Sequence, residues 1–331
     1  MFRRWGEGRD DADASINIPN KYLRPVSFTR FNKIKNSHFQ IHFNFKAFSP
    51  ADFFFTDRHS GLIHLNTHSM RSVNLVPQPE VVATDIFNKQ YLAAVHDPND
   101  VSIVDLETKK TIMTSNFGYH PHQLINCVKF IDDRSGGLKL VIGANFDKLQ
   151  VFDVEKPTKP IHSFAVPYNV NYIAGNKAQT TVALAYDGLP VDIYDFREGE
   201  CVASLDGHSD NSFAVDYHAS DMYLASGNQD KTARVWDLRK AAPLKVLPMS
   251  AGPAAHLRYV QDSRYLVVGE NYSYLHCYDT ALDYSAKTSL DYFGELVGFD
   301  FNDMQTELYA GVASSRSNVF SGILRMKVGG K

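Results

Sequence analysis

Short stretches of alternating apolar and polar residues, each ending in an aspartate, recur along this chain at a nearly constant interval. The last three intervals between these aspartates are 42 residues each, and the interval before them is 48. Two weaker stretches, at 61–67 and 322–327, extend the series. A period of this size, built from short strands, is typical of a β-propeller. The five clear stretches are VSIVDLE (Asp105), LQVFDVE (Asp153), VDIYDFR (Asp195), ARVWDLR (Asp237) and LHCYDTA (Asp279).

One unit, residues 211–249, shows the internal order most clearly. Period-two alternation predicts strands separated by short turns of polar residues, and helical periodicity is hard to find anywhere in the chain. We therefore expect an all-β, seven-bladed propeller of four-stranded antiparallel blades, with six or eight blades as the alternatives. The strands predicted in this unit are 211–218, 222–227, 232–238 and the outermost 244–249.

The two ends of the chain suggest how the ring closes. A blade cannot bury both of its faces alone, so the ring has to close to remove exposed strand edges. The final unit ends at GILRMK (322–327) without a fourth strand, and YLRPVSFTRFN (22–32) is placed to supply one from the other terminus. This predicts one propeller over residues 21–331, preceded by a flexible acidic tail at 1–20.

The composition excludes several classes of function. The formal net charge is −3 with 21% charged residues, so no broad basic field is available for nucleic acid or an anionic membrane. The three cysteines, Cys127, Cys201 and Cys277, are far apart and odd in number, which suits a reducing compartment. No signal peptide or membrane span is recognisable, so we expect a cytoplasmic or nuclear protein.

A serine, a histidine and an aspartate within the clearest unit raise the question of a hydrolase. His208, Ser226, Asp230 and Trp236 lie within thirty residues, and Gly207-His208 with Trp236-Asp237 resembles one complete WD repeat. The resemblance implies that these four side chains form a buried hydrogen-bonded chain, a structural tetrad inside the blade. A hydrolase would need an activated serine in an open pocket with oxyanion donors, and no nucleophile elbow surrounds Ser226.

The resemblance can be narrowed to a group of WD-repeat, transducin-like proteins of plants and fungi. It is closest from about 165 to 327 and weaker at 38–55, whereas the first three units lack the Gly-His and Trp-Asp pairs. The group carries no settled biochemistry, so it informs the fold more than the function. The segments that resemble this group most are 207–213, 227–232 and 291–298.

Patterns of catalytic or metal-binding chemistry are missing from the sequence. It contains no metalloprotease, phosphate-loop or calcium-loop pattern. The densest histidine group, His120-Pro121-His122, is more typical of a turn than of a ligand pair. We expect no cofactor, no metal and no enzymatic activity. An enzyme with its site at the central channel is the least favoured alternative, and it would require perturbed histidines or carboxylates converging there.

Binding is the better class, because propellers carry function on the loops of their rims. The turns between second and third strands and the entries to first strands share one rim, where aromatic and charged residues suit a protein or peptide partner. Each residue taken singly is also compatible with an ordinary solvated turn. The candidate partner-binding residues of this rim are Asp187, Gln229, Lys231, Asn271, Tyr272, Phe293, Glu295 and Arg316.

The opposite rim gives a sharper alternative. Two successive units end in Tyr-Asp-Phe-Arg and Trp-Asp-Leu-Arg, which place Arg197 and Arg239 at equivalent positions. The window Leu224–Arg239 resembles the box of substrate receptors of cullin–RING ubiquitin ligases, which implies that these arginines contact the ligase adaptor. The competing interpretation is that each arginine caps local carbonyls or pairs with a local acid. We expect a monomeric propeller that scaffolds other proteins within a larger complex.

Overall fold

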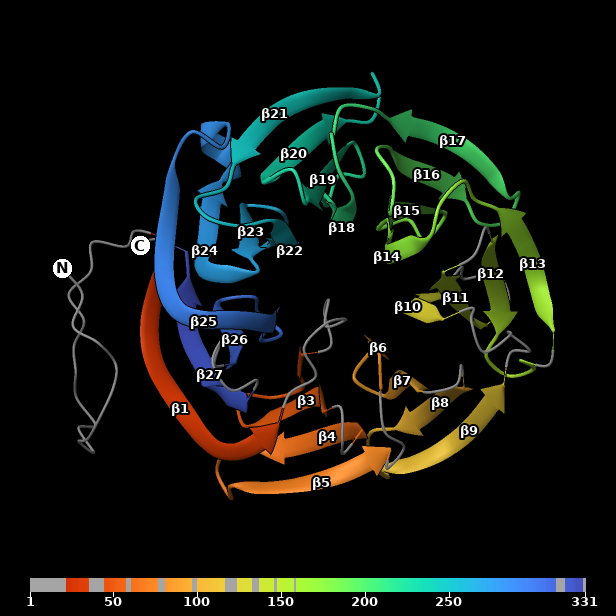
Figure 1. The fold of residues 1–331 in the computed structure, drawn as a ribbon. Coiled ribbons are helices and arrows are strands. Elements are labelled where there is room, and N and C mark those ends of the chain that lie inside the picture. The colour runs from red at the N-terminus through yellow and green to blue at the C-terminus, as the bar shows by residue number, and fades with distance from the viewer. Residues whose placement is uncertain are drawn as a thin grey trace.

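The computed structural model of the chain describes residues 22–35, 45–57, 61–76, 81–96, 100–116, 124–132, 137–145, 148–157, 159–313 and 319–329. Within these ranges the fold is all-β: 27 strands and one short 3-10 helix, Thr280–Leu282. Figure 1 shows the sheets arranged around a centre, with β6, β10, β14, β18 and β22 innermost and β5, β9, β13, β17 and β21 at the periphery. In the described residues no helix is long and apolar enough to cross a membrane.

Five sheets have four antiparallel strands each, in sequence order from the inside outwards. The first is β2 (Lys46–Ala47), β3 (Asp52–Asp57), β4 (Gly61–Asn66) and β5 (Arg71–Val76), and the second is β6 (Ala83–Phe87), β7 (Tyr91–His96), β8 (Asp100–Asp105) and β9 (Lys110–Asn116). The third is β10 (Ile125–Asp132), β11 (Leu138–Ala144), β12 (Lys148–Asp153) and β13 (Pro160–Ala165). The fourth is β14 (Val170–Gly175), β15 (Thr181–Tyr186), β16 (Val191–Asp195) and β17 (Glu200–Leu205), and the fifth is β18 (Ser212–Tyr217), β19 (Tyr223–Asn228), β20 (Thr232–Asp237) and β21 (Ala242–Pro248).

The sixth sheet has seven strands in the order β1-β27-β26-β25-β24-β23-β22. Its long strand β25 pairs with β24 through its first half and with β26 through its second half. Counting β25 twice divides the sheet into two groups of four strands, which gives seven four-stranded groups among the described strands. The strands are β22 (Ala254–Val260), β23 (Tyr265–Glu270), β24 (Tyr272–Asp279), β25 (Lys287–Phe301), β26 (Glu307–Ala313), β27 (Val319–Val328) and β1 (Leu23–Lys35).

The N-terminal stretch predicted to serve the final unit lies in β1, which pairs antiparallel with β27. Leu23 lies opposite Val328, and just before the strand the backbone N–H of Tyr22 donates to Thr288 Oγ1 at 3.1 Å. Residues 1–20, predicted as a flexible acidic tail, and the His120-Pro121-His122 stretch lie outside the described residues.

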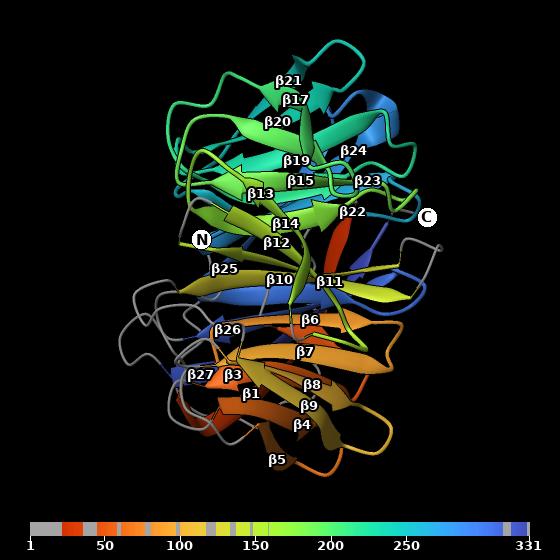
Figure 2. The ribbon, with the colours of Figure 1, turned by 90° about the vertical axis from the view of Figure 1, so that its right-hand side faces the viewer.

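Burial explains why the strands have these sequences. The middle strands lie between neighbouring sheets and are apolar on both faces, as in β15, where five consecutive residues are buried. The fourth strand faces solvent on its outer side, so β17 is largely exposed. The aromatic run Phe53–Phe55 is buried as expected, and Phe53 packs against Tyr309 of β26, which joins the first sheet to the last group. Figure 2 shows the stacked sheets from the side.

Candidate functional site

The structure brings the predicted tetrad together inside the β18–β21 sheet, called here the Trp236 sheet. Trp236 Nε1 donates to Ser226 Oγ at 2.8 Å, Ser226 Oγ lies 2.7 Å from His208 Nε2, and His208 Nδ1 lies 2.8 Å from Asp230 Oδ2. The Asp230 carboxylate can only accept, so the proton of a neutral His208 sits on Nδ1, facing it. Nε2 is then an acceptor, and the Ser226 hydroxyl accepts from Trp236 and donates to Nε2. All four side chains therefore have a partner in one continuous chain.

The surroundings of the tetrad explain its protonation and exclude nucleophilic chemistry. Burial lowers the pKa of His208, which keeps the imidazole neutral. Burial tends to raise the pKa of Asp230, but hydrogen bonds from Thr232 and His208 outweigh it and hold this pKa below its usual value. Ser226 and Trp236 have no exposed surface. A substrate cannot reach a serine oxygen that is enclosed and already bonded to Trp236, so the tetrad is framework.

The tetrad also fixes a loop. Asp230 Oδ2 accepts the backbone N–H of Ser209 at 3.2 Å, and Asp230 Oδ1 accepts from Thr232 Oγ1 at 2.6 Å. The chain segment that leads into β18 is thereby tied to the turn between β19 and β20.

The next group of strands fixes the equivalent loop with different residues, which the sequence did not reveal. This group consists of β22, β23, β24 and the first half of β25. In this group, called here the Glu270 sheet, the Glu270 carboxylate accepts the N–H groups of Ser250, Ala251 and Gly252 at 2.5, 2.7 and 2.6 Å. Its Oε1 also lies 2.7 Å from His276 Nε2, and neither side chain is exposed.

The Glu270 carboxylate is stabilised in its ionised form. Burial tends to raise the pKa of Glu270, but the hydrogen bonds from His276 and the loop N–H groups lower it below its usual value. A glutamate at the end of a strand, just before a turn, was the available signal, but its burial depends on the loop that folds over it.

Six of the residues predicted for one rim lie on a single edge of the molecule, called here the upper rim. Asn271 and Tyr272 are adjacent, Tyr272 lies opposite Glu295 across β24 and β25, and Asn271 O accepts the N–H of Leu296. The structure therefore brings these three together. Asp187 accepts a hydrogen bond from Asn171 Nδ2 at 2.8 Å on the fourth sheet. Gln229 and Lys231 lie in the turn between β19 and β20 of the Trp236 sheet. This sheet lies between the fourth sheet, which carries Asp187, and the Glu270 sheet, which carries Tyr272.

Two of the predicted rim residues lie in a different element from the one expected, and part of the predicted set lies outside the described residues. Phe293 and Glu295 were expected in a loop entering a first strand, but both lie within β25, which continues from one group of strands into the next. The strand shifts register here, since Tyr274 pairs with Asp291 and Tyr272 with Glu295. The side chain of Phe293 and all of Arg316 lie outside the described part of the chain.

The opposite edge, called here the lower rim, carries the two predicted arginines. Arg239 donates through Nε and Nη2 to the two carboxylate oxygens of Asp237, at 2.9 and 2.7 Å, and its Nη2 also donates to Tyr223 Oη at 3.1 Å. Arg197 makes the same fork to Asp195, at 3.3 and 3.0 Å. These arginines hold the pKa values of Asp195 and Asp237 below their usual range. Each arginine pairs with a local acid, yet its side chain is about half exposed, at 51% for Arg197 and 55% for Arg239.

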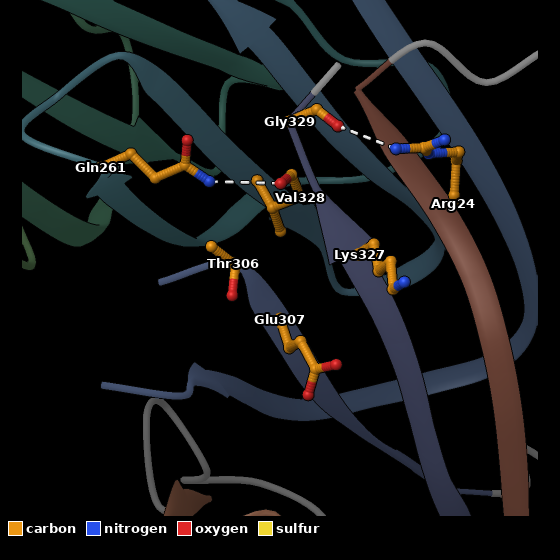
Figure 3. A pocket seen from close by; sticks show the side chains of 7 residues that line it. All are labelled: Arg24, Gln261, Thr306, Glu307, Lys327, Val328 and Gly329. Atoms are coloured by element: carbon orange, nitrogen blue, oxygen red, sulfur yellow. Dashed lines mark hydrogen bonds between the residues drawn. The ribbon is translucent and has the colours of Figure 1, made fainter. Parts of the chain in front are cut away.

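Next to the lower rim an open pocket of about 410 Å³ lies between β1, β26, β27 and the turn at Gln261 (Figure 3). Gln261 Nε2 donates to Val328 O at 3.2 Å, and Arg24 Nη2 donates to Gly329 O at 3.4 Å. Several polar groups of its lining are thus engaged within the protein.

A ring of charge on the innermost strands was also missed. Basic and acidic residues alternate around the innermost strands, except in β14, which has no charged residue. Each acid accepts a backbone N–H from the next strand, as Asp216 does from Tyr259 at 2.7 Å. Burial lowers the pKa of Lys46 to about 8 and raises the pKa of Asp216. In four of the six members the charged residue comes directly before an aromatic one in a first strand. The members are Lys46, Asp85, Lys129, Asp216, Arg258 and Asp300.

This ring does not revive the enzyme interpretation. The carboxylates of Asp85, Asp216 and Asp300 bind backbone N–H groups of Phe130, Tyr259 and Ala47, which is a framework role. Among the residues that the structure describes, no group of histidine, cysteine and acidic side chains converges in a way that could hold a metal ion.

Four-stranded sheets around a centre, one of them containing a Trp-Ser-His-Asp chain, define a propeller with WD repeats. A family model described as "WD domain, G-beta repeat" matches residues 199–237, which run from β17 to β20. The chain therefore contains a WD repeat at 199–237, within an all-β fold of repeated four-stranded sheets that is consistent with a β-propeller.

Parts of several known proteins are similar to this chain. The chain is 31% identical over 127 residues to a DDB1- and CUL4-associated factor 11 homolog of Caenorhabditis elegans, a match that covers 36% of this chain and 22% of the relative. It is 28% identical over 98 residues to Jouberin of Rattus norvegicus, covering 29% of this chain and 9% of Jouberin. Protein groucho of Drosophila melanogaster is 25% identical over 154 residues, covering 46% and 20%.

The matched regions thus span about a fifth or less of these relatives' own length. WD40 repeats suggest a protein-interaction scaffold, and WD40 propellers are generally non-catalytic.

Proposed function

We propose that this chain is a non-catalytic scaffold that presents its upper rim to a protein or peptide partner. The observation that carries the proposal is Tyr272, an aromatic side chain that is 46% exposed on a rim whose backbone is fixed from beneath. Glu270, two residues before it, is fully buried and holds the 250–252 loop through three hydrogen bonds. An exposed aromatic residue on a backbone that is already fixed loses little backbone entropy on binding, which favours it as an anchor.

The neighbours of Tyr272 supply polar contacts around that anchor. Glu295 lies directly opposite Tyr272, and Lys231 lies in the turn of the adjacent sheet, where it adopts a left-handed backbone conformation with φ 61°. An aromatic centre with a charged surround is the usual composition of a protein interface. We further propose a cytoplasmic or nuclear location, which the three unpaired cysteines Cys127, Cys201 and Cys277 support.

The test compares the proteins captured by the wild-type chain with those captured by Tyr272→Ala and Lys231→Ala. Val202→Ala is the matched control, since Val202 is 55% exposed on the outer strand β17, away from both rims. We expect one set of partners to be lost with the two rim variants and kept with the control, each binding then being reproduced with the purified partner. Partners that bind all four chains equally would contradict the use of this rim.

A second candidate, a substrate receptor of a cullin–RING ubiquitin ligase, is favoured by the lower rim. Arg197 and Arg239 hold the same forked pair with an aspartate on successive sheets and remain about half exposed. One relative is named for its association with DDB1 and CUL4. In this function the exposed guanidinium edges bind the adaptor, because a planar fork pairs with two acceptors at once.

The receptor function is tested by direct binding of the purified chain to purified DDB1. We expect wild-type protein to bind and Arg197→Ala/Arg239→Ala to lose most of the affinity. Arg71→Ala is the control, because Arg71 is exposed at the start of β5 in a different sheet. Wild-type protein that does not bind DDB1 would rule this candidate out and leave the upper-rim scaffold as the function.

A further inference from the structure

We propose that Arg264 is a third adaptor-contacting residue, which extends the lower-rim contact over three consecutive sheets as one row of guanidinium groups. This inference rests on the proposed receptor function. The row is Arg197, Arg239 and Arg264, one arginine from each of the fourth sheet, the Trp236 sheet and the Glu270 sheet.

The pattern of a strand-ending aspartate followed two positions later by an arginine is absent from the Glu270 sheet. Asp195, Asp237 and Asp279 end equivalent strands at intervals of 42 residues, and the first two are followed two positions later by arginine. The residue two positions after Asp279 is Ala281, so a motif search finds nothing there. In the structure, Arg264 approaches Asp279 from the turn before β23.

The third pair is a two-oxygen fork like the second, but it is made through Nη1 and Nη2 of Arg264 rather than through Nε and Nη2 as in Arg239. Arg264 Nη1 lies 2.6 Å from Asp279 Oδ1, and Nη2 lies 2.8 Å from Oδ2, which is again a fork on a carboxylate. The Arg264 guanidinium carbon lies 5.4 Å from the ring centroid of Tyr265, as that of Arg239 lies 5.4 Å from Tyr223. Tyr223 and Tyr265 are opposite Asp237 and Asp279 in their strands. A Tyr-Asp-Arg cluster thus forms in both sheets, with the arginine after the aspartate in one and before β23 in the other.

Exposure decides what a partner meets on this row. The three arginine side chains are 51%, 55% and 41% exposed, whereas the paired carboxylates are 18%, 8% and 2% exposed. The acids lie beneath and the guanidinium groups outermost, so the surface presents guanidinium N–H donors, each above the carboxylate that balances its charge. The complementary partner is a protein surface rich in carboxylate and carbonyl oxygens.

The row is also preorganised. The turn of the fourth sheet donates the N–H groups of Lys177 and Ala178 to Asp221 of the Trp236 sheet, at 2.8 and 3.0 Å. The turn of that sheet in turn donates the N–H of Ala219 to Ser263 Oγ, next to Arg264, at 2.7 Å. These hydrogen bonds join the turns between first and second strands, the last of which carries Arg264. Arg197 and Arg239 lie in the turns between third and fourth strands, where Asp195 and Asp237 hold them. Side chains positioned before binding lose less entropy when a partner binds.

The test measures the dissociation constant of Arg264→Ala for purified DDB1, beside wild type, Arg197→Ala/Arg239→Ala and Arg71→Ala. We expect Arg264→Ala to weaken binding about tenfold, as the loss of one hot-spot arginine from an interface does. Arg71→Ala is expected to match wild type. Because removal of Arg264 leaves Asp279 without its cation, Arg264→Lys is the second variant. It keeps the charge but not the fork, and we expect about threefold weaker binding.

The outcomes separate the two hypotheses. If wild type binds, Arg197→Ala/Arg239→Ala loses affinity, and both Arg264 variants bind like wild type, the receptor function stands and the row is overturned. If wild type does not bind, both are overturned. Weakened binding by a variant whose thermal midpoint equals that of wild type supports the row.

Discussion

The Trp236 sheet and the Glu270 sheet are neighbours, and each fixes the loop that leads into its inner strand by a different set of hydrogen bonds. In the first, the segment leading into the inner strand is held by a chain of four side chains that ends at Asp230. In the second, a single carboxylate, Glu270, takes three backbone N–H groups of the corresponding segment and a histidine besides. At an offset of 42 residues, Val268 stands where Ser226 does.

The difference shows that a sheet can satisfy the N–H groups of this loop without the recognisable Trp-Ser-His-Asp motif. A loop folded over the end of a sheet carries N–H groups that must find acceptors once water is excluded. A neutral network and a buried anion both meet this need. The absence of the Trp-Ser-His-Asp pattern from a unit therefore says little about how firmly its rim is held, and the two solutions should respond differently to substitution and to pH.

The largest expected effect is that of Glu270→Ala. The change strands three loop N–H groups and His276 in a site without solvent, so we expect a loss of about 3 kcal/mol or more in the free energy of unfolding, measured by urea denaturation. Glu270→Gln should be intermediate, because its amide keeps one acceptor but turns an NH₂ group toward existing donors. A loss below about 1 kcal/mol for Glu270→Ala would mean that water replaces the carboxylate.

A smaller loss is expected for Ser226→Ala in the Trp236 sheet. It removes the shared partner of Trp236 Nε1 and His208 Nε2, both neutral groups, and should cost about 1–3 kcal/mol in the same assay. Ser209→Ala is the control, since Ser209 is exposed and should change stability by less than about 0.5 kcal/mol. If Ser226→Ala proved as costly as Glu270→Ala, the ranking of network and anion would be wrong.

The smallest effect, but the most specific, is a difference in pH range. The folded-state pKa of His208 is lowered from 6.5, so the unfolded chain binds more protons and the Trp236 sheet loses stability as pH falls below about 6.5. The folded-state pKa of Glu270 is lowered from 4.5, so its contribution is complete above that value and is lost only as pH falls further. Hydrogen exchange should show Ser209 losing protection at a higher pH than Ser250–Gly252, after correction for intrinsic rates. Loss of protection in one common range would remove the distinction.

Much of the fold could be read from the sequence because it depends on short-range pattern. The strands predicted around Ser226 and Trp236 agree with β18–β21 to within one or two residues, since alternation and turn residues act locally. The tetrad was accessible because its spacing is characteristic.

What could not be read depends on contacts between units. Glu270 looks like any polar strand end until the 250–252 loop covers it, and Arg264 pairs with Asp279 across two strands, outside the spacing of a linear motif. The continuity of β25 between two groups of strands was likewise hidden, because the Phe293-Gly294 region reads as a turn. Long-range pairing, rather than residue type, is what a single sequence conceals.

The pairing of β1 with β27 has a consequence for biogenesis. Arg24 and Gly329 are 305 positions apart, so β1 leaves the ribosome long before the strand that completes its hydrogen bonds. Until then it is an unpaired strand edge, the kind of surface that other chains can extend. The last step of folding is therefore a slow search between distant segments. We expect this first strand to need protection from other chains until translation is nearly complete.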